Sequence, residues 1–302
     1  MSQPQDMMAD MQDGTPTTVL AIPATRPRRR KPVWRRLLLS PSAIALIIIV
    51  LLAAFAGVIA PYGEAQINPV AALEPPSFAH LMGTDTFGRD IFSRVLYGGR
   101  LSLMIGCSAA AIGATIGVLV GMAAGYFGGR IDSIAMRIID VLLAFPGTLL
   151  AIVIVAVLGP NLLNLVLAVG IASVPGYARL VRSLSLSIRE SDYVTAARAT
   201  GVRSWTIIFR HVFPNLRNSV IVYATLNIAT AILNAAGLGF LGLGSKPPTA
   251  EWGLMVADGR ETLEIAWWIT AFPGLSILVT TLVIYSFGET LTAALDPRQS
   301  RQ

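Results

Sequence analysis

The sequence predicts an all-α integral membrane protein with six transmembrane helices and a helical docking loop in the cytoplasm. The chain has 302 residues, of which 54% are hydrophobic and only 13% are charged, and its mean hydropathy is +0.65. Soluble domains typically carry about 25% charged residues. The low charge content and six long apolar runs therefore exclude an ordinary soluble protein. A long polar stretch in the second half, residues 188–215, is the expected docking loop.

Composition also limits the partners of the chain. Its net charge is +6 and its pI is about 9.9. In a soluble protein these values would favour nucleic-acid binding, but retention of Lys and Arg on the cytoplasmic side of a membrane explains them better here. We therefore expect membrane lipid around the chain and no nucleic-acid partner. The single cysteine, Cys107, lies in an apolar run and cannot form an intrachain disulfide, so a packing role is expected.

The first 40 residues differ from the rest of the chain. They are polar and end in a basic cluster, a composition that cannot bury a core. We expect a flexible cytoplasmic tail over residues 1–40 and a transmembrane domain over residues 41–302. A cleaved signal peptide is the alternative. However, the apolar run 43–60 exceeds the usual signal segment of about 7–15 residues and begins too far from Met1.

Six apolar runs are each long enough to cross a hydrocarbon layer of roughly 30 Å at about 1.5 Å per residue. The expected membrane helices cover residues 43–60, 101–126, 132–158, 162–180, 216–244 and 267–291. The fourth contains Pro175 and is expected to kink there, and the fifth ends in the small-residue run GLGFLGLG. The sixth begins with Trp267 and Trp268, which fit an aromatic anchor at the membrane surface.

The second run contains glycines at a spacing of four residues, namely Gly113, Gly117, Gly121 and Gly125. This spacing places them on one face of a helix. Such a face lets a neighbouring helix approach closely, and close packing drives helix association in lipid. We expect this face to pack against another helix.

Asp140 and Pro146 distinguish the third run. Pro146 is expected to kink the helix because proline lacks a backbone N–H. An ionisable residue inside a membrane helix is a functional candidate. Asp140 lies near the cytoplasmic end, however, where water or an arginine such as Arg137 can reach it. A structural role is therefore favoured.

Residues 188–215 have the pattern of two short helices joined at a glycine. Ser187 and Glu190 have the spacing of a capping box that can start the first helix, and Asp192 is a second candidate cap. Four residues recur at helical spacing on one face, and three of them are small enough for another protein's backbone to come close. They are Tyr193, Ala196, Ala197 and Thr200. This face is suited to enter a cleft of a partner.

Gly201 is expected to end the first docking helix, and Ser204 can cap the second. Pro214 is expected to stop the second helix before the next apolar run. The apolar residues at helical spacing in the second helix are Trp205, Ile208, Phe209 and Val212.

Basic residues predict the sidedness of the chain. With both termini in the cytoplasm, 18 of the 23 Lys and Arg residues fall on the cytoplasmic side and 5 on the outside. The outer five are Arg89, Arg94, Arg100, Lys246 and Arg260. This distribution is what the positive-inside rule expects, and it predicts a cytoplasmic docking loop.

The connector 61–100 is expected to lie outside, and it leads into the phrase GTDTFGRDIFSRVLYGGRLSL at residues 83–103. Acidic and basic side chains alternate closely in this phrase. Asp85 and Asp90 could act as catalytic carboxylates. Arg89 and Arg94 are near them in the sequence, however, so that salt-bridged structural roles are favoured.

The sequence does not indicate catalysis. Residues 239–246, GFLGLGSK, approach a Walker A phosphate loop, but the final residues are in the wrong order and the segment follows no strand. His80 and His211 fall on opposite sides of the predicted membrane, and no Cys/His cluster has metal-ligand spacing. We expect no catalytic residue, no metal and no cofactor.

The order of residues in the docking loop resembles the EAA loop of the membrane subunits of bacterial ABC importers. In that loop an Ala-Ala pair, a Gly and a Pro mark the coupling helix. Thr195 stands here where the family has its leading Glu. The resemblance implies that the coupling loop 188–215 contacts an ATPase. The residues assigned to this contact are Tyr193, Ala196, Ala197, Arg198, Gly201, His211 and Pro214.

Further segments resemble the second permease subunit of dipeptide and oligopeptide ABC importers. They are the phrase at 83–103, RIIDVLLAFPGTLLAIVIVAVLGP at 137–160, AILNAAGLGFLGLGSKPPTAEWG at 231–253 and ALDPR at 294–298. The outer signature within the first comprises Asp85, Gly88, Arg89, Asp90 and Arg94. The resemblance implies a type I ABC importer permease fold in the bacterial inner membrane, forming half of a pathway for dipeptides or oligopeptides. The implied partners are a homologous permease subunit, two cytoplasmic ATP-binding subunits that hydrolyse ATP, and an external solute-binding protein.

Two other classes stay open from the residues alone. A secondary transporter driven by protons or sodium usually has acids at mid-membrane, broken helices and an internal repeat. Here only Asp140 is available, and the two halves show no obvious repeat. A membrane anchor could also use a docking loop, but the outer signature would then have no evident purpose. Relatives of peptide permeases also handle nickel, glutathione and other small solutes, and the sequence does not choose among these substrates.

Overall fold

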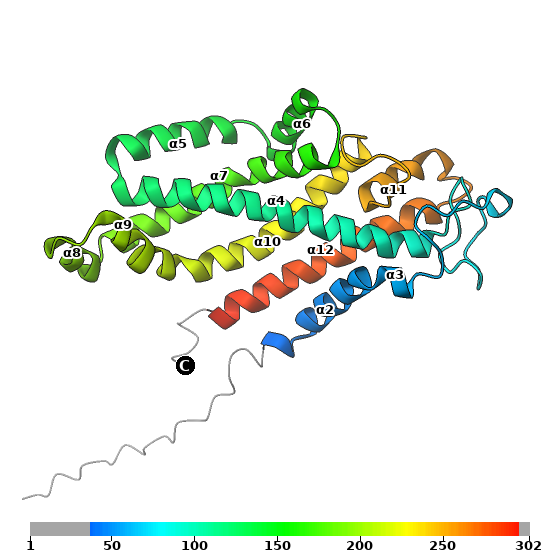
Figure 1. Ribbon diagram of the computed structural model, residues 1–302, viewed down its shortest axis with the longest axis horizontal. Coiled ribbons are helices and arrows are strands. Elements are labelled where there is room, and N and C mark those ends of the chain that lie inside the picture. The colour runs from blue at the N-terminus through cyan, green and yellow to red at the C-terminus, as the bar shows by residue number, and fades with distance from the viewer. Residues whose placement is uncertain (1–36, 296–302) are drawn as a thin grey trace, which may run out of the picture.

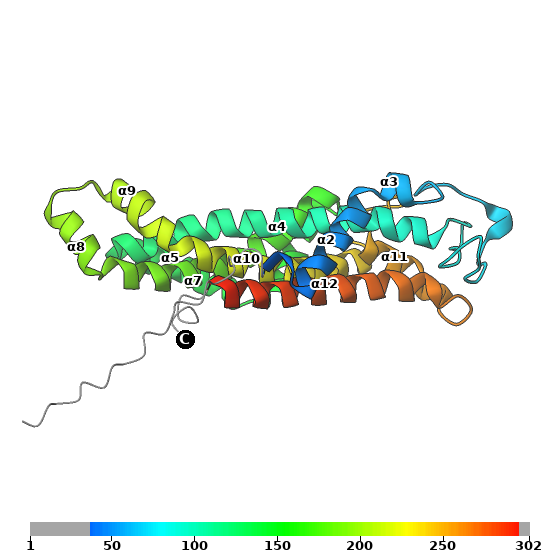
Figure 2. The same ribbon diagram turned by 90° about the horizontal axis from the view of Figure 1, so that it is seen from below.

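The computed structural model describes residues 37–295 of the chain, and the regular structure in this part is helical. Long helices run side by side along an elongated molecule (Figure 1). Figure 2 shows α8 and α9 at one end of it, and α11 with the loops that precede α4 toward the other. The expected tail over residues 1–40 lies almost wholly outside the described residues, as does the end of the ALDPR segment.

Four helices within residues 37–295 are long and apolar enough to cross a membrane. They are α4 (Ile91–Phe127), α7 (Leu162–Arg189), the continuous helix Ser204–Phe240 that includes α10 (Phe213–Phe240), and α12 (Trp268–Leu295). The pair α5 (Gly129–Leu143) and α6 (Gly147–Leu158) forms a fifth candidate, bent by 89°. An apolar helix of 14 residues, α2 (Pro41–Ala54), is shorter. The chain is therefore an all-helical membrane protein.

The first expected span, residues 43–60, is interrupted at Phe55. Helix α2 ends at Ala54, and a single turn, α3 (Ala56–Ile59), follows it. The last carbonyls of a helix lack partners within the helix. Two of them are bound here by Arg100, which donates from Nε to the Ala53 carbonyl at 3.4 Å and from Nη2 to the Ala54 carbonyl at 2.7 Å. Arg100 thus stabilises an end of α2 that the apolar pattern did not reveal.

The second and third expected spans also have different bounds. Helix α4 begins at Ile91 and not at residue 101, because the Asp90 carboxylate accepts a hydrogen bond from the Ser93 backbone N–H and caps the helix. The third run is broken, where a kink at Pro146 was expected. A residue before proline is disfavoured in the α conformation, so that α5 ends at Leu143, before Pro146 is reached, and α6 starts after Pro146 at a new angle.

The four spaced glycines of α4 lie against α7. A Cβ atom built on Gly121 would lie 2.6 Å from the Ala178 carbonyl oxygen, and one on Gly125 would lie 2.7 Å from the Arg182 carbonyl oxygen. Gly113 and Gly117 meet Gly170, Val174 and Tyr177 in the same way. The helices touch backbone to backbone, and any side chain would force them apart. This contact between α4 and α7 is the most extensive between helices in the described chain.

The remaining helices extend this pair into a bundle. Helix α10 packs on α4, α7 and α12, and α12 also packs on α2 and on α11 (Trp252–Asp258).

Cys107 is exposed on α4, so that its expected packing role is wrong. The two tryptophans expected to form an aromatic anchor have different environments. Trp267 is exposed, whereas Trp268 is buried and donates from Nε1 to the Thr84 carbonyl at 3.1 Å.

The glycine contact yields a prediction about assembly. Gly121→Leu should lower the recovery of monodisperse protein after solubilisation several-fold, since overpacking of this kind costs about 1–3 kcal/mol. Gly237→Leu is the matched control, because a Cβ atom at this exposed helical glycine of α10 meets nothing within 4 Å. Size-exclusion chromatography of fluorescently tagged protein measures both. Equal recovery of the two variants would show that the glycines are not needed for the contact.

Candidate functional site

The docking loop lies at one end of the bundle and begins with α8 (Asp192–Ala199). The expected capping box at Ser187 and Glu190 does not start this helix, because α7 continues to Arg189 and its backbone is still helical there. The N-cap residue is Ser191, whose side-chain hydroxyl donates to the Ile188 carbonyl and accepts no hydrogen bond from the N–H groups of α8. The preceding membrane helix therefore leads into α8 through a single corner.

The end of α8 has the geometry of a Schellman motif. Gly201 has φ +78°, its N–H donates to the Arg198 carbonyl at 3.1 Å, and the Val202 N–H donates to the Ala197 carbonyl at 3.1 Å. A Cβ atom at Gly201 would meet nothing within 4 Å. Glycine is therefore favoured there by backbone conformation and not by lack of space.

One buried side chain attaches α8 to the bundle. Val194 is fully buried in a cluster built from the ends of the membrane helices, whose members come from α4, α7 and the start of α10. They include Val118, Met122, Tyr126, Val181, Ile208, Val212 and Leu216. A displacement of α8 would therefore act on three membrane helices at once.

The opposite side of α8 is largely exposed. Thr195 and Ala196 are exposed, and Tyr193 is 46% exposed, whereas Ala197 is half-buried against the Val194 cluster. The face expected for docking is thus rotated, with Ala197 at its edge. Thr195, at the position of the family's Glu, points outward, so that the missing carboxylate would have been on the exposed face.

Pro214 does not stop the second docking helix. Helix α9 (Ser204–Ile207) continues through a π-helical turn, η2 (Ile208–Val212), directly into α10. Proline cannot donate a backbone N–H, and its ring clashes with the carbonyl four residues earlier. The wider π turn just before Pro214 absorbs this defect, so that the helix passes through. Residues 204–240 therefore form one continuous helix that leads from the loop into the membrane.

Polar contacts join α8 to this second helix. Asn215 Nδ2 donates to the Tyr193 hydroxyl at 3.3 Å and to the His211 carbonyl at 2.5 Å, and the rings of Tyr193 and His211 lie 6.3 Å apart. The guanidinium of Arg198 lies 5.5 Å from the centre of the Tyr126 ring on α4. The structure thus brings Tyr193 and His211 together, whereas Arg198 lies against α4. Asn215, which joins Tyr193 to His211, was not anticipated because a single amide has no distinguishing sequence pattern.

The apolar residues of the second docking helix divide between two faces. Ile208 and Val212 are buried, as an amphipathic helix requires, but Trp205 is 64% exposed and Phe209 is 56% exposed. Their rings are stacked with centres 6.1 Å apart. The buried face instead contains Ile207. The π turn changes the helical register here, so that a spacing of 3.6 residues misassigned these aromatic residues.

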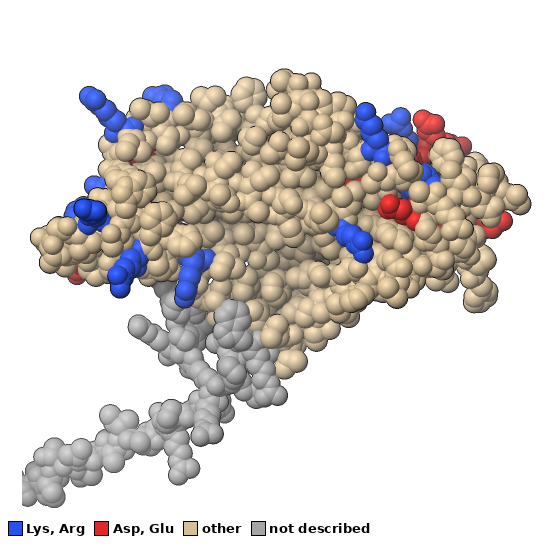
Figure 3. All heavy atoms as spheres, viewed as in Figure 1, with Lys and Arg blue, Asp and Glu red and all other residues tan. Residues whose placement is uncertain are grey.

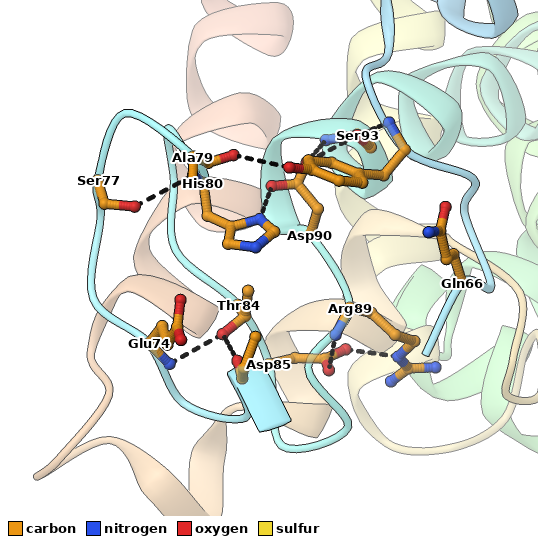
Figure 4. A network of polar contacts seen from close by, with 12 residues as sticks. Gln66, Glu74, Ser77, Ala79, His80, Thr84, Asp85, Arg89, Asp90 and Ser93 are labelled. Atoms are coloured by element: carbon orange, nitrogen blue, oxygen red, sulfur yellow. Dashed lines mark hydrogen bonds and ion pairs between the residues drawn. The ribbon is translucent and has the colours of Figure 1, made fainter. Parts of the chain in front are cut away.

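The outer signature forms a compact network of polar contacts (Figure 4). It lies in the loops before α4, at the end of the bundle opposite α8 (Figure 1). Asp85 accepts hydrogen bonds from the backbone N–H groups of Phe87 at 2.9 Å and Arg89 at 3.0 Å, and Arg89 Nε donates to its second oxygen at 2.6 Å. Gly88 has φ +70°, and a Cβ atom there would overlap the carbonyl of Asn68. These contacts make Asp85 the centre of a tight turn.

Asp90 pairs with His80, and the expected pairing with Arg94 is wrong. One Asp90 oxygen lies 2.9 Å from His80 Nδ1, while the other accepts hydrogen bonds from Ser93 N and Oγ, each at 2.7 Å (Figure 4). Because Asp90 caps α4, its carboxylate is directed toward the helix N-terminus and away from the Arg94 guanidinium. His80 reaches it from the preceding loop, which sequence spacing could not show.

Arg94 joins separate outer segments. Its side chain is 2% exposed, and Nη1 donates to the carbonyls of Glu64 at 2.9 Å and Pro248 at 3.1 Å. Its Nε lies 3.8 Å from Asp85, and Nη2 lies 4.0 Å from Asp258. Burial raises the pKa of Asp258, an effect that Arg94 and Arg89 oppose. Segments that are far apart in the sequence are therefore held together around one buried cation.

Two buried residues at the start of α11 were not anticipated by sequence reasoning. Glu251 is 1% exposed and caps α11 by accepting hydrogen bonds from the N–H groups of Gly253 and Leu254, each at 2.8 Å. Burial raises the pKa of Glu251, and these hydrogen bonds lower it in part. Trp252 donates from Nε1 to the Val95 carbonyl at 2.9 Å. Helix α11 is therefore partly buried, and it packs on α12, α10 and α4.

Asp140 pairs with Arg179 of α7, at 2.7 Å, and not with Arg137. Both side chains are 57% exposed. Asp132 forms a second pair with Arg182, one helical turn further along α7. These two pairs tie α5 to α7. No group of three or more potential metal ligands is present in the described part of the chain.

Comparison with known proteins shows the family. Residues 117–301 match the family described as binding-protein-dependent transport system inner membrane component. One relative is a dipeptide transport system permease protein of Alkalihalophilus pseudofirmus, with 47% identity. The alignment covers 84% of the present chain and 85% of that relative. It is 45% identical over 84% of its length to 86% of a di/tripeptide transport system permease protein of Pseudomonas aeruginosa. It is also 43% identical over 88% of its length to 90% of a glutathione transport system permease protein of Pectobacterium atrosepticum.

A solved structure shares the fold. A chain of the MetNI methionine ABC transporter, in an inward-facing conformation, aligns with a TM-score of 0.54 at 16% identity. The alignment covers 68% of the present chain and 98% of that chain. The helical architecture described above is therefore that of an ABC importer permease. The chain belongs to the binding-protein-dependent transport system inner membrane component family, and it is a multi-pass inner membrane permease subunit.

Proposed function

We propose that the chain forms half of the translocation pathway of an ATP-driven importer for dipeptides or other short peptides. The relatives named for dipeptides, di/tripeptides and glutathione support this substrate class. A homologous permease would supply the other half, two cytoplasmic ATP-binding subunits would hydrolyse ATP, and an external binding protein would deliver the peptide. The observation that carries the proposal is α8, an exposed helix attached to three membrane helices through the buried side chain of Val194.

Coupling follows from this attachment. When the ATPase partner closes on nucleotide, α8 moves with it if its exposed face is seated in that partner. The motion reaches α4, α7 and α10 through the Val194 cluster, and it reaches α10 a second time through the continuous helix that starts at Ser204. Packed apolar clusters transmit displacement because they are dense and compress little. The loop therefore acts as a lever on the membrane helices.

We further propose six spans with both termini in the cytoplasm. The interrupted pair α2 and α3 would be the first span and the bent pair α5 and α6 the third. Figure 3 supports this orientation: basic side chains gather at the end that carries α8 and α9, whereas acidic and basic side chains mix at the other end. Basic residues are retained on the cytoplasmic side of membranes. The α8 end is therefore assigned to the cytoplasm.

This orientation predicts the reactivity of introduced cysteines. In a Cys107→Ser background, Glu74→Cys and Lys246→Cys should react with an impermeant maleimide added to intact cells, whereas Ser204→Cys should react only after lysis. All three positions are exposed, so that accessibility in the fold does not limit labelling. Labelling is read by a mass shift on gels. Reaction of Ser204→Cys in intact cells would reverse the topology.

The coupling role predicts a separation of assembly from transport. Gly201→Val should insert normally but lose peptide uptake, together with either ATPase binding or binding-protein-stimulated ATP hydrolysis, because a β-branched residue at φ +78° costs about 1–2 kcal/mol and changes the corner. Gly159→Val is the matched control, since Gly159 also has a positive φ, +93°, and open space around it, but lies in the turn between α6 and α7.

A second pair of variants tests the exposed face directly. Ala196→Trp should prevent seating of α8 and abolish stimulated hydrolysis, while Ala196→Ser should retain it. Ala196 is preferable to Ala197 for this purpose, because Ala197→Trp would also disturb the cluster beneath the helix. Wild-type uptake by both Gly201→Val and Ala196→Trp would show that α8 is not the coupling element.

A further inference from the structure

A groove between α2, α4 and α12 is distinct from the coupling loop and from the outer signature. Its volume is about 230 Å³, and its floor is formed by buried residues of α4 together with Trp252. Its sides include Leu52, Leu275 and Val279, which are 40%, 53% and 44% exposed. The groove is apolar and opens sideways on the surface formed by α2 and α12, where the hydrocarbon of a bilayer would lie.

A cation lies at the edge of this groove. Arg100 directly follows Gly99, which lines the groove, and its Nε donates to the carbonyl of Ala53, which also lines it. The carbonyls of Ala53 and Ala54 hold the guanidinium at the end of α2, where the helix dipole is negative. The position of the charge is therefore fixed by the backbone of a neighbouring helix.

The charge of Arg100 is not neutralised within residues 37–295. Arg100 has no ion-pair partner among them, and its Nη1 makes no hydrogen bond to them. Arginine has five N–H donors in a planar fork that fits a phosphate. Arg100 is exposed beside the apolar surface, and an arginine near the end of an apolar run reaches the level of the lipid headgroups.

We propose that this groove binds an anionic phospholipid, with an acyl chain between α2 and α12 and the phosphate on Arg100. The groove exceeds the roughly 150 Å³ in which an apolar protein cavity binds benzene, so that it has room for a stretch of acyl chain. Arg100 immediately precedes the apolar run 101–126, which matches the depth of a phosphate group. A partner helix would fill the apolar part but would leave the arginine without a counter-ion unless it also supplied an acid.

Native mass spectrometry of the purified transporter complex tests this site, with phosphatidylglycerol and phosphatidylcholine added at equal concentration. The wild-type chain should retain phosphatidylglycerol in preference to phosphatidylcholine. Arg100→Gln should weaken phosphatidylglycerol binding about tenfold, because it removes a charge-assisted contact. Val279→Trp should weaken binding of both lipids by filling the groove.

Matched controls separate this site from general effects on charge and bulk. Arg260→Gln removes an exposed outer arginine that pairs with Glu261, and Leu282→Trp adds bulk to an exposed position of α12 outside the groove. Both should bind lipid like wild type. Unchanged binding in Arg100→Gln or Val279→Trp, equal retention of the two lipids by the wild type, or crosslinking of Val279→Cys to the homologous permease without bound lipid would overturn the proposal.

Discussion

The close approach of α4 to α7 is the contact on which the rest of the structure depends. Four glycines on α4 let the two backbones meet, and a Cβ atom at Gly121 or Gly125 would lie within 2.7 Å of a carbonyl oxygen of α7. Association in lipid depends on such packing, because apolar side chains are as well solvated by lipid as by protein. Once α4 and α7 are packed together, α10 and α12 have a surface on which to pack. The same two helices also supply part of the apolar cluster that surrounds Val194.

The two ends of this unit have different construction. At the end formed by the loops before α4, Arg94 and Asp85 are buried and bind segments that are far apart in the sequence, so that this end is held together by charge and hydrogen bonds. At the α8 end, a short helix is attached by one buried valine and a few side-chain contacts. Few contacts permit movement, and a rigid opposite end gives that movement a fixed reference. This asymmetry suits a subunit that takes mechanical work from a partner at one end only.

Much of the architecture could be predicted from the sequence because apolar runs and glycine spacing are local signals. The long membrane helices, the glycine face of α4 and the corner at Gly201 belong to this category. Helix ends were predicted less well, since they are decided by side chains distant in the sequence, as when Arg100 binds the end of α2. Pro214 was expected to stop the helix, but a π turn just before it lets the helix continue. Such a turn breaks the periodicity that a sequence pattern assumes. Partners such as His80 with Asp90 or Arg179 with Asp140 arise from tertiary folding and leave no mark in spacing.

Coupling requires that the exposed face of α8 is seated in an ATPase subunit. Zero-length or short crosslinking from Ala196→Cys, in a Cys107→Ser transporter purified with its ATPase subunits, measures this contact directly. We predict a crosslink to the ATPase whose yield changes with the nucleotide state, and a crosslink from Ser219→Cys, at a half-buried position within α10, should not form. Absence of the Ala196→Cys crosslink in a complex that hydrolyses ATP and imports peptide would contradict it.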